Sequence, residues 1–343
     1  MSLNAHAIDH QLSESFHADA TISAACQGIL TTKITPTNTP WYATLNQELD
    51  DLKGVAQQWD KEEVNQLKNT VLPAIIECGL AFTQSENHLL DLFNQAEADP
   101  IKQKQALTTG LQALNKPAKA IVTAISHYES SLKSWGNRLR QAHDKLNASV
   151  GKIQSKEQSL ASRIQSVNKT IVDLQNQIVK DKTLIKKAQK AAKKSNVVKT
   201  IFGIILGAAT GGVGAILAGM GVSSIGDAEK KVRALERSIE KYQLELYKHH
   251  NDLTHEQQEL IALKGLTLSA SVALSDVTVA EQSLDTVRTQ WDQFHQELTG
   301  VIGKIENATD AQRIIVEKAW FNAACKEWAL VIKDAQDTAS LAA

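Results

Sequence analysis

The chain has 343 residues, and its 37 Lys and Arg residues nearly balance its 38 Asp and Glu residues, giving a formal net charge of −1. Because such a balance creates no field that attracts a polyanion, the composition argues against binding of nucleic acid. The three cysteines, Cys26, Cys78 and Cys325, are far apart, which argues against a disulfide framework and favours buried positions. The length permits two domains.

Residues 1–30 are predicted to form a helix, because apolar residues recur on a common side at helical spacing. We expect an interruption of this helix around Asp19. The next stretch, residues 31–40, contains two of the five prolines and is predicted to be a loop. The apolar residues of the first helix are Ile8, Leu12, Phe16, Cys26 and Ile29.

Further helices are predicted over residues 41–59 and 61–96. The second is expected to bend or restart at Pro73, whose ring cannot continue the hydrogen-bond ladder. The dipeptide Asp99-Pro100 ends this element. A shorter helix follows, and we expect it to end at Pro117.

No proline occurs after Pro117, and from there apolar residues recur at steps of four and three. Such a sustained repeat indicates a coiled coil or a long bundle helix from Ala118 to Val198, here called the first arm. The repeat begins with Ile121, Ile125, Tyr128, Leu132, Trp135, Leu139, Ala142, Leu146 and, after a stutter, Val150.

A second arm of the same length runs from Asp227 to Asn307 and carries a similar repeat, although Gly265 is expected to break it. Two arms of equal length predict an antiparallel hairpin of long helices. The repeat includes Ala270, Leu274, Val277, Ala280, Leu284, Val287, Trp291, Phe294, Leu298, Val301 and Ile305. A last helix over residues 310–339 has an apolar stripe of Ile314, Phe321, Ala324, Trp328 and Val331.

Between the arms lies the uncharged segment, Ile201–Ile225, which contains no ionisable group. As a helix it would be about 37 Å long, enough to span a hydrocarbon core of roughly 30 Å. Its Ile, Leu, Val and Phe residues supply only about −3 to −6 kcal/mol of insertion free energy, which favours conditional insertion. The predicted membrane-inserting residues are Ile201, Phe202, Ile204, Ile205, Leu206, Val213, Ile216, Leu217, Met220, Val222 and Ile225.

Glycines and other small residues recur at every fourth position of the uncharged segment, which would let helix backbones pack closely in lipid. The segment can alternatively form a β-hairpin that turns at Gly211-Gly212, or a buried core hairpin of a soluble protein. The glycines predicted to serve as hinge or packing positions are Gly203, Gly207, Gly211, Gly212, Gly219 and Gly226.

A run of lysines precedes the uncharged segment, with Asp181 as the one acid among them. Such a basic collar is attracted to anionic lipid headgroups, and a merely solvated helix face is the alternative interpretation. The lysines predicted to contact headgroups are Lys186, Lys187, Lys190, Lys193, Lys194 and Lys199.

Motifs for catalysis are missing from the sequence: there is no HExxH, GxxxxGK[ST], CxxC or GxSxG. Two histidine groups have spacings that metal ligands can adopt, but solvated helix faces explain both. These groups are His6 with His10, and His249, His250 and His255. We therefore predict no enzyme activity, no metal site and no cofactor.

Long helices are followed by an uncharged Gly-rich segment, which lies between a Lys-rich approach and the exit Asp227–Lys231, and long helices follow it again. This order of elements resembles the cytolysin A type of α-pore-forming toxin. Related groups are the haemolysin BL and non-haemolytic enterotoxin components, the Xax and Yax toxins and the motility-associated killing factor cytotoxins. The resemblance covers the whole chain as an order of elements, and its specific part is Val197–Asp227.

The resemblance implies an all-α fold, an elongated bundle of about five long helices. Residues 1–180 and 245–343 would form the tail, and residues 181–244 a head whose tongue, the uncharged segment, is a helix or a β-hairpin in the soluble form. On contact with a target-cell membrane the tongue would be released and inserted, and subunits would assemble. The expected partners are membrane lipid and homologous toxin subunits, in a homo- or hetero-oligomeric pore.

The first residues lack the regions of a secretory signal, so we expect a protein secreted without a classical signal peptide. Two other functions remain open. One is an integral-membrane coiled-coil scaffold, with the uncharged segment as a single span and the arms on opposite sides of the bilayer. The other is a type III translocator-like protein, although such proteins usually carry a longer or second hydrophobic region.

Overall fold

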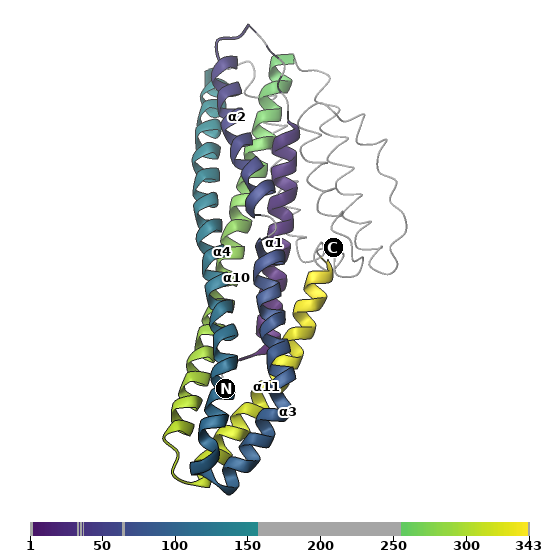
Figure 1. The fold of residues 1–343 in the computed structure, drawn as a ribbon. Helices are drawn as coiled ribbons and strands as arrows, with labels where there is room; N and C mark the ends of the chain where they lie inside the picture. The colour runs from purple at the N-terminus through teal and green to yellow at the C-terminus, as the bar shows by residue number, and fades with distance from the viewer. Residues whose placement is uncertain are drawn as a thin grey trace, which may run out of the picture. The chain divides into compact units, whose positions relative to one another are not determined.

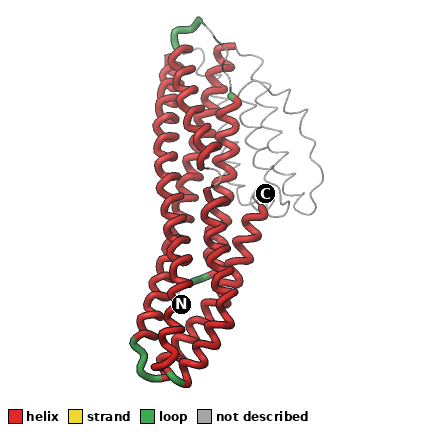
Figure 2. The backbone as a smooth tube through the Cα atoms, in the orientation of Figure 1, coloured by secondary structure: helices red, strands yellow, loops and turns green. Residues whose placement is uncertain are grey.

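The computed structural model describes residues 3–32, 34, 36, 38–63, 66–156 and 255–341. Within these ranges all regular secondary structure is helical, which confirms the all-α prediction for this part of the chain (Figures 1 and 2). The α-helices are α1 (Ala5–Thr31), α2 (Tyr42–Gln58), α3 (Leu72–Ala98), α4 (Pro100–Lys156), α10 (His255–Glu306) and α11 (Ala311–Leu341). Between α2 and α3 lie two short π-helical segments, η1 (Trp59–Glu63) and η2 (Leu67–Val71).

These helices belong to two compact units. Unit 1 contains Met1–Phe16, Asn65–Leu132 and Val279–Ala343, and unit 2 contains His17–Val64 and Lys133–Thr278. Helices α1, α4 and α10 contribute residues to both, so each unit is built from segments that are distant in the sequence.

Helix α1 is continuous, so the predicted interruption around Asp19 is wrong. An Asp in a helix interior costs only about 0.7 kcal/mol relative to Ala, whereas burying one Ile side chain stabilises by roughly 1.5–3 kcal/mol. Because Ile22 in the next turn is fully buried, the apolar face of the helix outweighs the local preference of Asp19. Of the predicted apolar residues, Ile8, Leu12, Cys26 and Ile29 are buried and Phe16 is half-buried.

Two predicted chain breaks are confirmed. Pro73 lies in the first turn of α3, where the helix does not need its missing N–H. Helix α3 ends before Asp99, whose φ of −142° departs from the helical region. The Asp99 carboxylate then accepts the N–H of Lys102 (3.2 Å) in the first turn of α4, so α3 and α4 are separate helices.

Two other predicted breaks are wrong, because α4 runs through Pro117 and α10 runs through Gly265. A proline in a helix interior costs about 3 kcal/mol and a glycine about 1 kcal/mol. Around Pro117 the side chains of Leu114, Ala118 and Ile121 are buried on the core face. Their combined burial is comparable to or larger than the cost of the proline, so the helix continues.

The predicted apolar repeats of both arms form the core over their described parts. In the first arm, every repeat residue from Ile121 to Val150 is at most 7% exposed. In the second arm, the repeat from Ala270 to Ile305 is buried except at Leu274, which is half-buried while its neighbour Ala273 is buried. The predicted stripe of the last helix, Ile314, Phe321, Ala324, Trp328 and Val331, is buried as well.

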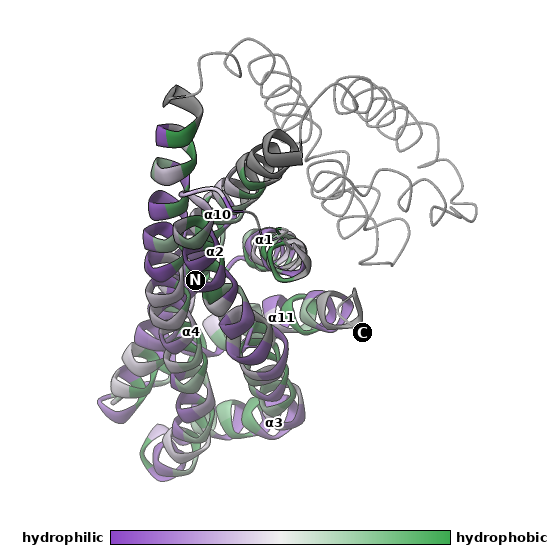
Figure 3. Ribbon diagram, turned by 90° about the horizontal axis from the view of Figure 1, so that it is seen from above, coloured by the Kyte–Doolittle hydropathy of each residue, from purple (hydrophilic) through white to green (hydrophobic). Residues whose placement is uncertain are grey.

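In unit 1, aromatic side chains from α3, α10 and α11 pack together. Phe82 stacks on Trp328 with ring centroids 5.0 Å apart, and Trp328 lies 4.7 Å from Trp291. Helices α3 and α11 lie side by side (Figures 1 and 3). At Gly79 they are so close that a Cβ atom would lie 2.2 Å from Cγ1 of Ile332, so this approach requires glycine.

Candidate membrane-active segment and the helices that lead to it

The residues predicted to act on a membrane lie outside the described part of the chain. The uncharged segment with its glycines and the lysines Lys186–Lys199 fall within residues 157–254, between the last residue of α4 and the first of α10. The inserting residues, the hinge glycines, the headgroup lysines and the choice between helix and hairpin therefore stay predictions. What the structure describes is the pair of helices on either side.

Helices α4 and α10, the described parts of the two arms, contact each other in unit 2. A Cβ atom on Gly136 would lie 2.8 Å from Cγ1 of Val277, which shows a close approach of the two helices. Two turns further along α4, Nε2 of His143 lies 3.0 Å from Oγ of Ser271, which precedes Val277 in α10. Since later residues of α4 contact earlier residues of α10, the helices are antiparallel, as the equal arm lengths predict.

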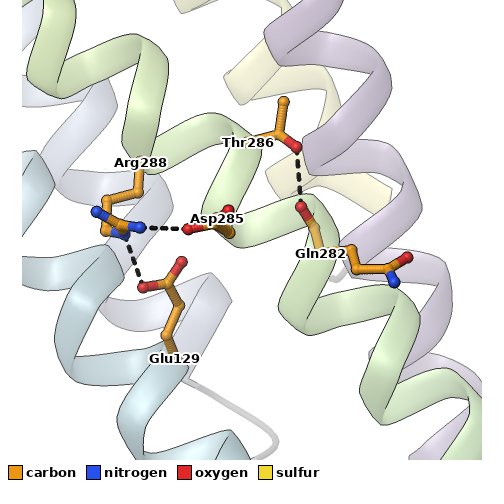
Figure 4. Close-up of polar contacts among 5 residues, drawn as sticks. All are labelled: Glu129, Gln282, Asp285, Thr286 and Arg288. Atoms are coloured by element: carbon orange, nitrogen blue, oxygen red, sulfur yellow. Dashed lines mark hydrogen bonds and ion pairs between the residues drawn. The ribbon is translucent and has the colours of Figure 1, made fainter.

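The same pairing occurs within unit 1, where an ion-pair cluster joins α4 to α10 (Figure 4). Arg288 Nε donates to Oε2 of Glu129 (2.9 Å), and the same guanidinium donates to the Asp285 carboxylate one turn earlier in α10. Burial raises the pKa of Glu129 above its usual range, although the neighbouring Arg288 cation opposes the shift. Thr286 Oγ1 donates to the carbonyl of Gln282 (2.9 Å), a bond within α10.

Paired arms conflict with one of the functions that the sequence leaves open. If the uncharged segment were a permanent single span with one arm on each side of the bilayer, α4 and α10 could not contact each other. The contacts in both units therefore argue against the integral-membrane scaffold. Over the described ranges, no helix is both long enough and apolar enough to cross a bilayer.

One hydrogen-bonded chain in unit 2 has the residue types of a hydrolase triad. Ser271 Oγ bonds to Nε2 of His143, and His143 Nδ1 lies 2.8 Å from Oδ1 of Asp144. An acyl-transfer site also needs free N–H donors beside the serine to bind the oxyanion. Ser271 lies inside α10, where backbone N–H groups are bonded within the helix, and the Asp144 side chain is 67% exposed. We therefore interpret this chain as a polar contact between α4 and α10.

Two tryptophans of unit 2 connect neighbouring elements in ways that the sequence does not reveal: Trp59 of η1 contacts α1, and Trp135 of α4 contacts α2. Trp59 and Trp135 pack with ring centroids 4.6 Å apart. The indole N–H of Trp59 donates to Oγ of Ser23 (2.9 Å), and that of Trp135 donates to the backbone carbonyl of Val55 (2.9 Å). The sequence contains one sign that Trp135 is buried, which is its position in the apolar repeat of the first arm.

The histidine groups give no metal site in the described ranges, which contain no set of three His, Cys, Asp or Glu side chains that could hold an ion. His6 and His10 are exposed. The second group, His249, His250 and His255, lies outside the side chains that the structure describes.

The three cysteines are buried and form no disulfide, as predicted. Burial raises the pKa of the Cys78 thiol well above its usual range. Burial, with a smaller effect of the nearby Glu86 carboxylate, raises the pKa of Cys325 to about 12. Such thiols stay protonated and are poor nucleophiles at neutral pH.

Solved structures of toxin components share this fold. Motility Associated Killing Factor B from Vibrio cholerae is 13% identical with a TM-score of 0.66, and the match covers 98% of this chain and 94% of that one. The HblL1 toxin component of Bacillus cereus is 16% identical with a TM-score of 0.61, covering 96% and 95%. Soluble AhlB, of the tripartite α-pore-forming toxin AHL from Aeromonas hydrophila, is 16% identical with a TM-score of 0.62, covering 98% and 93%.

AhlB has also been solved as a pore, and that form matches with a TM-score of 0.55 at 16% identity, covering 98% of this chain and 97% of that one. No protein-family model and no curated protein matches the chain. At these identities the likeness shows a shared fold: the chain has the helical-bundle fold of α-pore-forming toxin components.

Proposed function

We propose that the chain is a secreted, non-enzymatic component of a bacterial α-pore-forming toxin. One observation carries the proposal: the uncharged segment, Ile201–Ile225, joins two antiparallel arms within the fold of such components. Toxin components of this fold that belong to tripartite toxins support partner subunits of the same fold as the expected partners.

In the proposed mechanism, a head of residues 181–244 carries the uncharged segment, and a tail of residues 1–180 and 245–343 supports it. The segment stays shielded from water until a membrane is available, because its insertion free energy of about −3 to −6 kcal/mol makes it a marginal anchor. The lysines before it would contact anionic headgroups at about 1 kcal/mol each. AhlB, solved in a soluble and a pore form, supports a change between two such states.

The test is the double substitution Gly207→Asp and Ile216→Asp in the full chain. Two aspartates cost about 5–7 kcal/mol at the centre of a membrane helix, as much as the whole segment supplies or more. We expect loss of co-sedimentation with phosphatidylcholine/phosphatidylglycerol vesicles and an unchanged helical circular dichroism spectrum. The matched control replaces two exposed residues, Gly300→Asp and Ile101→Asp, and should bind like the wild type.

Unchanged vesicle binding by the Gly207/Ile216 variant would contradict the proposal. Dye release from vesicles by the wild-type chain alone would identify a self-sufficient pore former. Binding without release would identify a subunit that needs partner chains.

A further inference from the structure

Helix α11 carries apolar side chains on its outer face as well as on its core face. Ile315, Val316 and Leu330 are 52%, 59% and 44% exposed. The exposed cations Lys326 and Lys333 lie on the same face, because residues three or four apart are neighbours on a helix. Of the acidic residues of α11, Glu317 is buried, Glu327 and Asp334 are half-buried, and Asp337 is exposed one turn after Lys333. Around Leu330 the outer face of α11 therefore carries two lysines, and Asp337 is the one exposed acid of the helix over its described side chains.

The neighbouring helix α3 is acidic. It contains four acidic residues and neither Lys nor Arg. Its outer face presents Leu80, which is 42% exposed, together with the exposed acids Glu77 and Asp91. Helices α3 and α11 lie side by side in unit 1 (Figure 3). The exposed acids and Leu80 of α3 therefore adjoin the exposed lysines and apolar side chains of α11.

The internal contacts of unit 1 give the register of these two helices. Gly79 meets Ile332, and Lys318 Nζ lies 2.8 Å from Oε1 of Glu97, so α3 and α11 are antiparallel. Leu80 and Leu330 therefore lie at about the same level along the pair, as do Glu77 and Lys333. Asp91 lies within roughly one turn of the level of Lys326.

We propose that the α3/α11 face binds the same face of a second copy of this chain in a two-fold symmetric dimer. A two-fold axis parallel to the helices places α3 opposite the partner's α11. Rotation about this axis leaves the position of every residue along the helices unchanged. Leu80 then meets the partner's Leu330, Glu77 meets the partner's Lys333, and Asp91 lies near the partner's Lys326. Each contact occurs twice.

The size of this face suits a dimer. Helix α3 has 27 residues and is about 40 Å long, and two adjacent helices are roughly 20 Å wide, which gives on the order of 800 Å² per copy. That area is typical of one side of a stable protein–protein interface. An anionic lipid surface fits less well, because Glu77 and Asp91 would face it. The dimer does not rest on the proposed membrane activity, since it involves no residue of the uncharged segment.

Charge reversal in the full chain tests the dimer. Lys326→Glu with Lys333→Glu should raise the dimer dissociation constant, measured by analytical ultracentrifugation, by about tenfold or more, because attraction becomes repulsion at four places. Glu77→Lys with Asp91→Lys should weaken it similarly, and the chain with all four reversals should recover most of the affinity. The matched control changes exposed lysines of α4, Lys116→Glu and Lys119→Glu, and should leave the dissociation constant unchanged.

A cysteine experiment tests the register. Chains carrying Leu80→Cys mixed with chains carrying Leu330→Cys should form a disulfide-linked heterodimer under mild oxidation, whereas Leu80→Cys mixed with Lys116→Cys should not. A wild-type chain that stays monomeric up to about 100 μM would overturn the proposal. So would a chain with all four reversals whose dimer dissociation constant is no lower than that of either two-residue variant. Loss of binding to phosphatidylglycerol vesicles in Lys326→Glu/Lys333→Glu, with unchanged self-association, would assign the face to lipid instead.

Discussion

Gly79 shows how a single residue controls the distance between two helices. A Cβ atom there would lie 2.2 Å and 2.6 Å from two carbons of Ile332 and 3.1 Å from Trp328. Because Ile332 is 9% exposed and Trp328 fully buried, neither can move away freely. The sequence shows a glycine within a helix at this position but does not show which side chain it meets.

We predict that Gly79→Ala lowers the free energy of unfolding by about 1–3 kcal/mol, the usual range for an overpacked core. Urea denaturation monitored by circular dichroism measures this change. The control Gly300→Ala, at a position with nothing within 4 Å of the added carbon, should instead stabilise by roughly 0.5–1 kcal/mol. Equal effects of both substitutions would show that packing against Ile332 is unimportant.

Glu129 links the pairing of α4 and α10 to pH. Its pKa is raised in the folded protein, mainly by burial, so the folded state binds this proton more tightly than the unfolded chain does. The resulting stabilisation is fully present below the unfolded pKa of about 4.3 and is lost as pH rises through the higher folded value.

Glu129→Gln should therefore flatten the dependence of unfolding free energy on pH above pH 4, by at most about 1.4 kcal/mol per pH unit. Urea titrations from pH 4 to pH 7 provide the measurement. The exposed Glu62→Gln, which removes the same charge outside the cluster, is the control. A pH profile that Glu129→Gln leaves unchanged would contradict the assigned cause.

At the scale of the helix, sustained patterns proved more reliable than single residues. The repeats of both arms and the stripe of the last helix predict the core because each combines many buried side chains. Asp19, Pro117 and Gly265 were expected to interrupt helices and do not, since each costs about 3 kcal/mol or less against several buried neighbours. The π-helical segments η1 and η2 have no recognisable sequence signal, and the contact of Trp59 in η1 with Ser23 of α1 depends on the tertiary fold.

Trp135 contacts the turn that leads into η1. Its indole N–H donates to the Val55 carbonyl (2.9 Å), which lies four residues before Trp59, the first residue of η1. The same carbonyl also accepts the backbone N–H of Trp59, so the indole is a second donor to it at the junction of α2 and η1.

Replacement of Trp135 by Phe keeps an aromatic ring against Trp59 but removes the donor. We expect a loss of about 0.5–1.5 kcal/mol in unfolding free energy, because the Val55 carbonyl keeps the Trp59 N–H, and faster hydrogen exchange over residues 56–63. Trp320→Phe is the control, because its indole bonds to the side chain of Glu297 in unit 1, outside this turn. Unchanged exchange over residues 56–63 in Trp135→Phe would show that η1 does not depend on this bond.

At the scale of the whole molecule, the proposed insertion of the uncharged segment raises the question whether the paired arms have to separate. A Cβ atom on Gly136 would lie 3.7 Å from Cβ of Val277, within the distance range of a disulfide. The two helices can therefore be linked covalently without moving them apart.

We predict that Gly136→Cys with Val277→Cys forms a disulfide and that the oxidised chain still binds vesicles as the reduced chain does. The reason is that the proposed insertion involves residues 201–225, which this link does not include. Co-sedimentation of both forms gives the answer, and a non-reducing gel shows the link. Loss of binding on oxidation alone would mean that the arms must separate during insertion.

The candidate site could be predicted from the sequence only as a segment, since the lack of charge over Ile201–Ile225 is visible without a structure. The pairing of its flanking helices also followed from the sequence, because two equal arms have one simple antiparallel arrangement. The face formed by α3 and α11 did not, since it depends on how two helices far apart in the chain adjoin.

The buried cysteines supply an experimental reporter that needs no engineering. Cys26 belongs to unit 2, whereas Cys78 and Cys325 belong to unit 1, and all three are shut away from solvent. A thiol reagent added while the chain is incubated with vesicles would modify a sulfur only if its unit opens. If the proposed insertion opens a unit, peptide mapping at successive times would show whether unit 1 or unit 2 opens first.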